Sequence, residues 1–192
     1  MSVISLKTKQ KYGTLLAGNA FFMPSAFESI ATATGTGSSL EFTSIPSTYQ
    51  HLQIRGIART SNSSSVQDYL TMTFNSSNTG YAFHRLYGTA SSAAAAGFSS
   101  QSNITFYRAA GANATSNVFG GFIIDIHDYA STTKNKTVRY IGGIDNNDTN
   151  GEIDLGSGLW NNTNAISSIK INVGNGPAFV TGTQFALYGI KG

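Results

Sequence analysis

The sequence has no cysteine, only three prolines and little charge. Without cysteine it can form neither disulfides nor cysteine-based zinc sites. Charged residues make up 11% of its 192 residues, well below the roughly 25% of an ordinary soluble domain. No apolar run approaches the ~18 residues of a membrane-spanning helix. We therefore expect no disulfide framework and no membrane insertion.

Small polar residues take the place of the missing charge: 24 Ser, 21 Thr, 16 Asn and 21 Gly. These residues suit turns and the outer faces of sheets, and they make poor helix interiors. A free protein with so little surface charge is prone to associate. The composition therefore favours a β protein whose surface is largely covered by neighbours.

The positive charge is concentrated at the N-terminus. Lys7, Lys9 and Lys11 precede the first acidic residue, Glu28, and the remaining nine basic residues balance the nine acidic ones. Nucleic-acid binding needs a basic face on the folded body, and a neutral body argues against it.

Residues 1–26 differ from the remainder and form the first predicted unit, an extended N-terminal arm. They hold the three lysines and the apolar residues Phe21 and Phe22. Because adjacent exposed aromatic side chains are unfavourable in water, we expect the arm to dock on a partner through Lys7, Lys9, Lys11, Phe21 and Phe22. The alternative is a disordered terminus.

Residues 27–192 read as short strands separated by turns. In 49–59, Leu52, Ile54 and Ala58 alternate with polar side chains, the period-two pattern of a half-buried strand. The small-residue segments 89–102 and 109–117 are predicted to be loops. The predicted strands are 27–34, 39–43, 49–59, 69–75, 81–87, 104–108, 118–129, 137–144, 153–160, 166–173 and 179–190.

This spacing, with no amphipathic helix of useful length, predicts an all-β antiparallel sandwich. A jelly roll and an immunoglobulin-like sandwich both fit the pattern. The length of residues 27–192 favours the larger jelly-roll-like arrangement.

We expect the protein not to be an enzyme and to need no cofactor. The sequence contains no Gly-x-Ser-x-Gly elbow, Walker loop or His-Glu-x-x-His motif. Asp125 and His127 share one face of a predicted strand and could ligate a metal, but an outer polar pair is the simpler interpretation.

An oxygen-rich segment around Asp145, Asp148 and Asn150 is a weak calcium candidate, because Gly151 follows it. Aligning Gly151 with the sharp-turn position of a calcium loop places Ser157 where a bidentate Glu is required. A hairpin turn accounts for the same residues, and we expect no metal site here.

Aromatic residues suggest one further site. Tyr81, Tyr87, Tyr107 and Trp160 could form a platform that stacks on the apolar faces of a surface glycan. The alternative is that they pack in the core or in a subunit interface.

Several segments resemble a group of virion proteins from tailed bacteriophages of marine and cyanobacterial hosts. The likeness covers about residues 10–192. The motifs that carry it are FESIAT at 27–32, SIPSTY at 44–49, HLQIRG at 51–56, SGLW at 157–160 and QFALYGIKG at 184–192.

The resemblance implies a non-enzymatic structural role at the virion surface, in a protein made in the host cytoplasm. The expected function is capsid decoration, in which a cement or knob protein docks on the shell and stabilises it. The alternative is a tail-fibre or receptor-binding adhesin that recognises host glycan. The implied partners are other virion proteins, such as the major capsid or tail proteins, and further copies of the chain, most simply in a homotrimer.

Overall fold

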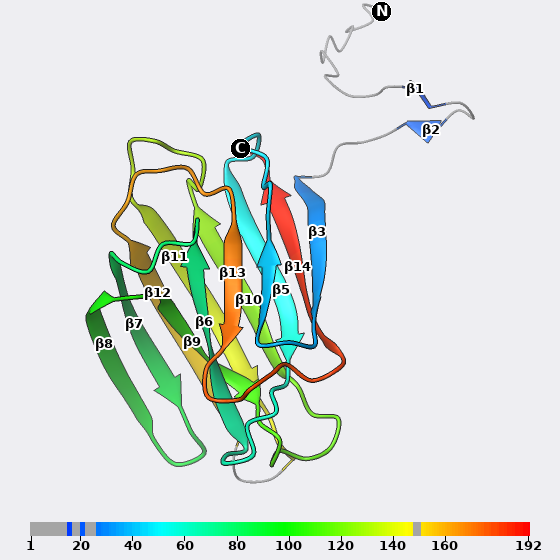
Figure 1. The fold of residues 1–192 in the computed structure, drawn as a ribbon, viewed down its shortest axis with the longest axis vertical. Coiled ribbons are helices and arrows are strands. Elements are labelled where there is room, and N and C mark those ends of the chain that lie inside the picture. The colour runs from blue at the N-terminus through cyan, green and yellow to red at the C-terminus, as the bar shows by residue number, and fades with distance from the viewer. Residues whose placement is uncertain (1–14, 17–19, 22–25, 148–150) are drawn as a thin grey trace, which may run out of the picture.

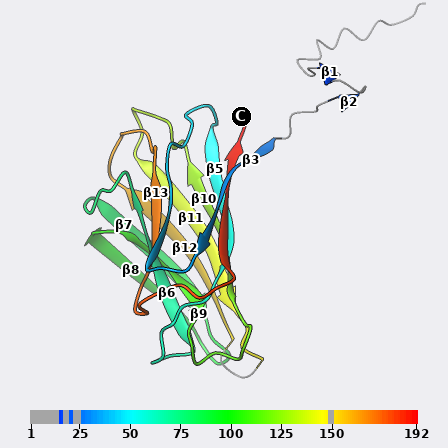
Figure 2. The same cartoon turned by 45° about the vertical axis from the view of Figure 1, so that its right-hand side comes forward.

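The computed structural model describes residues 15–16, 20–21, 26–147 and 151–192. These residues contain strands and no helix, and the two main sheets pack face to face (Figures 1 and 2). All strand pairs within the sheets are antiparallel. The prediction of an all-β antiparallel sandwich is confirmed.

The larger sheet has eight strands and the smaller has four among the described residues. A separate two-stranded hairpin, β1 (Leu15–Leu16) with β2 (Ala20–Phe21), precedes them. In spatial order the larger sheet is β3 (Phe27–Gly35), β14 (Thr183–Ile190), β5 (His51–Ala58), β10 (Gly120–His127), β11 (Lys136–Ile144), β12 (Glu152–Trp160), β7 (Tyr81–Gly88) and β8 (Ala93–Gln101). The smaller sheet is β4 (Ser39–Phe42), β13 (Ile169–Val173), β6 (Gln67–Phe74) and β9 (Ile104–Ala110).

Eight of these strands form four nested antiparallel pairs that alternate between the sheets. The pairs β3–β14 and β5–β10 lie in the larger sheet, and β4–β13 and β6–β9 lie in the smaller one. Two hairpins, β7–β8 and β11–β12, continue the larger sheet beyond β10. Strand β9, at the edge of the smaller sheet, packs across β11 and β12.

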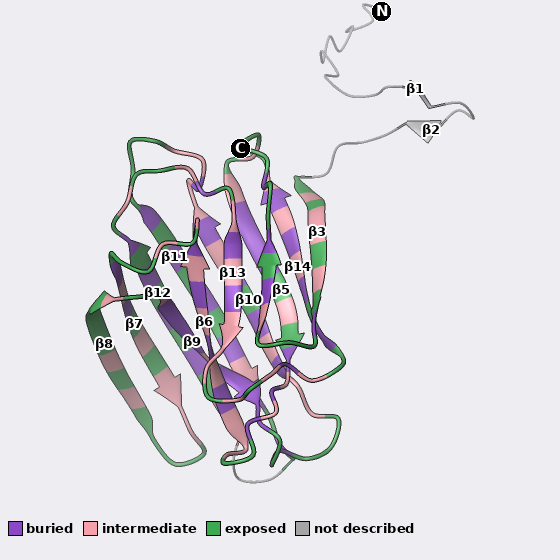
Figure 3. Ribbon diagram, in the orientation of Figure 1, coloured by how far each residue is buried: buried purple, intermediate pink, exposed green. Residues whose placement is uncertain are grey.

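Inward-facing side chains follow the predicted alternation in most strands (Figure 3). Leu52, Ile54 and Ala58 of β5 are fully buried, as predicted. Their neighbours on the facing sheet, including Met72 and Phe74 of β6, complete one continuous core. The periodicity of these strands thus identified the core directly.

The prediction that 89–102 is a loop is wrong, because β8 occupies Ala93–Gln101. Alanine and serine carry little intrinsic preference for strands. The backbone of β8 nevertheless pairs with β7 along most of its length, and cross-strand hydrogen bonds do not depend on side-chain type. Strand β8 forms an edge of the larger sheet, and most of its side chains are exposed or half-buried.

Strand β12 exposes most of its aliphatic side chains and buries small and polar residues, the reverse of the usual arrangement. Its apolar residues Ile153, Leu155 and Leu159 face outward and are 37–56% exposed. The inward positions are held by Asp154, Gly156, Gly158 and Trp160, all of which are buried. A shift of one residue would bury the three aliphatic side chains instead, so other interactions must hold this register.

Glycines on the inner face leave room for large side chains. An ideal Cβ on Gly56 would lie 2.2 Å from Cδ1 of Phe185. Gly121, on the adjacent strand, points outward, and a Cβ there would meet nothing within 4 Å. The two glycines provide a matched pair for testing the packing.

We predict that Gly56→Ala lowers the free energy of unfolding by about 1–3 kcal/mol, because Phe185 must shift in a close-packed core. Gly121→Ala should leave stability unchanged or raise it by up to about 1 kcal/mol, because the unfolded chain loses conformational freedom. Urea denaturation measures both. Equal effects of the two substitutions would contradict the assigned faces.

Candidate docking surface

The outer face of the larger sheet carries a broad band of exposed aliphatic side chains. The band runs across five adjacent strands, from β5 to β7. Its members are between 37% and 56% exposed: Ile57, Leu86, Ile123, Ile141, Ile153, Leu155 and Leu159. In the register, Ile123 pairs with Ile141, Ile141 with Leu155, and Leu155 with Leu86. Contiguous apolar patches on soluble proteins mark interaction sites.

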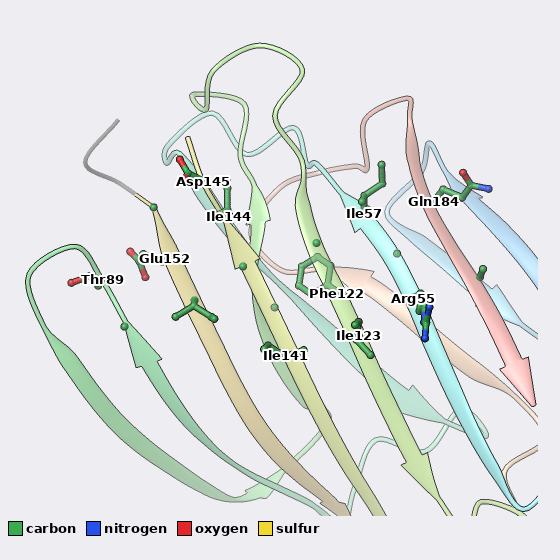
Figure 4. A pocket seen from close by; sticks show the side chains of 18 of the residues that line it. Arg55, Ile57, Thr89, Phe122, Ile123, Ile141, Ile144, Asp145, Glu152 and Gln184 are labelled. Carbon is green, nitrogen blue, oxygen red and sulfur yellow. The ribbon is translucent and has the colours of Figure 1, made fainter. Parts of the chain in front are cut away.

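A hollow lies within this band because two neighbouring outward positions are glycine. Gly121 and Gly143 pair directly across β10 and β11 and form its floor. Ile57 and Ile153 flank them on the neighbouring strands, and Ile123 lies one step along the sheet. Figure 4 shows Ile57, Ile123 and Ile141 around this floor. The open hollow has a volume of about 1080 Å³.

The polar groups around the hollow are few and mostly satisfied within the sheet. Arg55 donates from Nε to Oε1 of Gln53 at 2.6 Å. Gln53 in turn donates from Nε2 to Oδ1 of Asp125 at 2.7 Å. Asp145 and Thr89 lie at the opposite rim (Figure 4). Such a surface loses little hydration energy when an apolar partner covers it.

Behind this face, on the inner side of the sheet, lies a buried charge cluster centred on Asp154. Its carboxylate is fully buried and forms an ion pair with Arg85. The hydroxyl of Tyr140 donates to its Oδ1 at 2.8 Å. Burial and the neighbouring Asp154 carboxylate raise the pKa of Tyr140, which keeps the phenol protonated as a donor.

A second arginine, from the smaller sheet, joins the same cluster. Arg108 of β9 forms an ion pair with Glu152 of β12, and its Nη2 lies 4.0 Å from Oδ2 of Asp154. Its Nη1 donates to Oε1 of Gln67 at 2.6 Å. Burial lowers the pKa of Arg108, and the charge of Glu152 opposes that effect. The cluster therefore links the two sheets through charge-assisted hydrogen bonds.

The predicted glycan platform is not assembled. Tyr81 and Trp160 are each 1% exposed, and their rings stack in the core with centroids 6.1 Å apart. For Tyr81 and Trp160 the alternative of packing in the core therefore holds. The hydroxyl of Tyr81 accepts a hydrogen bond from the amide of Phe74 at 2.9 Å.

Tyr87 and Tyr107 are half-buried and hold a cation. The guanidinium carbon of Arg85 lies 4.1 Å from the Tyr87 ring centroid and 3.6 Å from that of Tyr107. These ring faces are therefore occupied by cation–π contacts within the protein.

The other predicted site residues lie wholly or partly outside the described part. Lys7, Lys9, Lys11 and Phe22 fall outside the described residues, and of Phe21 only the backbone in β2 is described. Asp148 and Asn150 of the calcium candidate also lie outside them, and Asp145 is exposed. The arm and the calcium candidate therefore remain predictions from the sequence.

Within residues 26–147 and 151–192, no cluster of three or more His, Asp or Glu side chains is placed to hold a metal ion. The described residues also include no helix that could cross a membrane. No protein-family model matches the chain, and comparisons with curated proteins and with solved structures find no match. A functional proposal for this chain therefore rests on the features of its surface.

We predict that Asp154→Asn lowers the free energy of unfolding by about 3–5 kcal/mol, because the buried Arg85 loses its counter-charge. Asp128→Asn is the matched control. Its ion pair with Lys134 is exposed, so the loss should stay below about 1 kcal/mol. Chemical denaturation of both variants at one salt concentration measures the two losses. Similar losses would show that the buried pairing of Asp154 does not stabilise the fold.

Proposed function

We propose that this protein is a non-enzymatic structural component of a tailed-phage virion, a capsid decoration protein that docks on the shell and stabilises it. Its larger sheet forms an interface within the assembly, and its N-terminal arm attaches the protein to the particle. The proposal joins the sequence resemblance to a specific surface of the fold.

The reversed orientation of β12 is the observation that carries the proposal. Ile153, Leu155 and Leu159 face outward although a one-residue shift would bury them. Aliphatic side chains in such a contiguous band are unfavourable in water and favourable against another protein. A surface of this kind supports a protein that works while covered by a neighbour.

The strand order gives further support, and we infer from it a jelly-roll topology. The four nested pairs, β3–β14, β4–β13, β5–β10 and β6–β9, alternate between two sheets, and β7–β8 and β11–β12 are two inserted hairpins. Jelly rolls occur in viral capsid proteins and also in lectins. The jelly roll supports the proposal by analogy with viral capsid proteins, and the exposed apolar band supports it independently.

The mechanism under this proposal is mechanical. A protein that binds only the assembled shell, across neighbouring subunits, stabilises it by its binding free energy. A durable interface of this kind buries roughly 1,200–2,000 Å² in total. A neutral body with an apolar face suits such a contact, because no like charges oppose it.

We predict that mass spectrometry of purified virions finds the protein in hundreds of copies per particle, as repeated shell sites require. A copy number of a few dozen or fewer would favour the tail-fibre or adhesin alternative, and a glycan array would then identify its ligand. Absence from the virion would contradict both roles.

We further predict that changing Lys7, Lys9 and Lys11 together to Glu weakens attachment to the particle, and most strongly at low salt, where charges are least screened. Lys170→Glu, on β13 of the smaller sheet, is the control and should bind as the unmodified protein does. Binding that is equal at every salt concentration would remove the lysines from the attachment site.

A further inference from the structure

We propose that the apolar half of the N-terminal arm, residues 15–23, seats in the glycine-floored hollow of a neighbouring copy and joins the copies into a closed ring. The inference rests on the proposed function, because it treats the outer sheet face as an interface between copies. It names the occupant of that face as a segment of this same chain.

The arm segment needs a surface to cover it. Its sequence, LLAGNAFFM, is almost wholly apolar. The hairpin formed by β1 and β2 has only two residues in each strand. An isolated two-stranded hairpin is at best marginally stable in water, so this one requires packing against another apolar surface.

The hollow offers the matching surface. Its floor, at Gly121 and Gly143, has no side chains, and Ile57, Ile123 and Ile153 surround it. A volume of about 1080 Å³ accommodates several side chains of leucine or phenylalanine size. Leucine and phenylalanine are the residues that the arm supplies.

The position where the arm leaves the sheet favours a neighbouring copy over the same chain. Phe27, the first residue of β3, pairs with Ile190 of β14, which pairs in turn with His51 of β5. His51 lies six residues before Ile57 on the same strand. Gly121 lies three strands across from β3. The strand spacings place Phe27 about 25 Å from the centre of the hollow.

Five residues, 22–26, separate the β1–β2 hairpin from Phe27. Phe21 and Phe27 are six Cα-to-Cα steps apart, which span at most about 22 Å when fully extended. The hairpin can therefore reach the centre of its own hollow only with this connection stretched almost to its limit, which costs conformational entropy. A neighbouring copy can present its hairpin without that constraint. A head-to-tail contact of this kind closes into a ring when the rotation between copies allows it.

This arrangement divides the arm into two parts with different tasks. The apolar part would link the copies. The part that carries Lys7, Lys9 and Lys11 precedes it in the sequence and remains available for the shell. The trimer expected from the resemblance is then the closed form of this exchange.

A variant whose new side chain fills the hollow tests the proposal, with light scattering to measure the oligomeric state. In Gly121→Leu the new side chain points into open space, so the fold should persist while the arm is excluded. We expect the unmodified full-length chain to form trimers and Gly121→Leu to be monomeric. Gly37→Leu, also in open space but in the turn before β4, is the control and should remain trimeric. An unmodified chain that is monomeric, or a trimer that survives Gly121→Leu, would overturn the proposal.

The absence of native cysteine allows a direct test of the contact. One preparation carries Leu16→Cys and the other carries Ile123→Cys, so any disulfide between them joins two different copies. Mixing and oxidation should give a cross-linked heterodimer, whereas pairing Leu16→Cys with Glu41→Cys on the smaller sheet should not. A double variant, Leu16→Cys with Ile123→Cys in one chain, that forms only intrachain disulfides would refute exchange between copies.

These outcomes are separable from failure of the proposed function. A chain that is monomeric but present in hundreds of copies on the virion would overturn arm exchange and leave capsid decoration standing. A chain that cross-links as expected but is absent from the virion would overturn capsid decoration and leave arm exchange standing.

Discussion

The carboxylate of Asp154 has no exposure to solvent, and the arrangement of the larger sheet depends on keeping it paired. Arg85 and Tyr140 satisfy it from the two strands that flank β12. A buried charge without a partner is strongly destabilising. The register of β12 is therefore specified by one residue and its two partners, and the aliphatic residues on the opposite face of that strand must point outward.

Steric contacts favour the same register of β12 as the buried charges do. An ideal Cβ on Gly156 would lie 2.1 Å from the ring of Tyr140, and one on Gly158 would lie 2.7 Å from Ile104. A shifted β12 would place larger side chains at these positions and leave Arg85 unpaired inside the sandwich. Exposure of Ile153, Leu155 and Leu159 follows from these two constraints, and it leaves the apolar band that a partner can cover.

Period-two patterns predicted most strands and the inner face of β5, because alternation reports burial on one side. They predicted the strand at 153–160 but not which face of β12 is buried, because long-range pairing of Asp154 overrides hydrophobicity there. They also missed β8, whose alanines carry no pattern. The burial of Tyr81 likewise depends on how the two sheets pack: its partner Phe74 is only seven residues away in the sequence, but it lies on the other sheet. The sequence did contain one sign of the outer aliphatic band. Ile123 and Ile124 are adjacent in β10, so each face of that strand had to carry an aliphatic residue.

Under the proposed function and arm exchange, the outer face and the arm would contribute to assembly through different physical interactions. Contact through the apolar hollow depends on removing aliphatic surface from water, which is insensitive to moderate salt. Contact through Lys7, Lys9 and Lys11 depends on Coulomb attraction, which salt screens within about 10 Å at 0.1 M. A chain with so few charges elsewhere keeps the two contacts independent. If both proposals hold, association between copies would therefore persist at salt concentrations that release the protein from the shell.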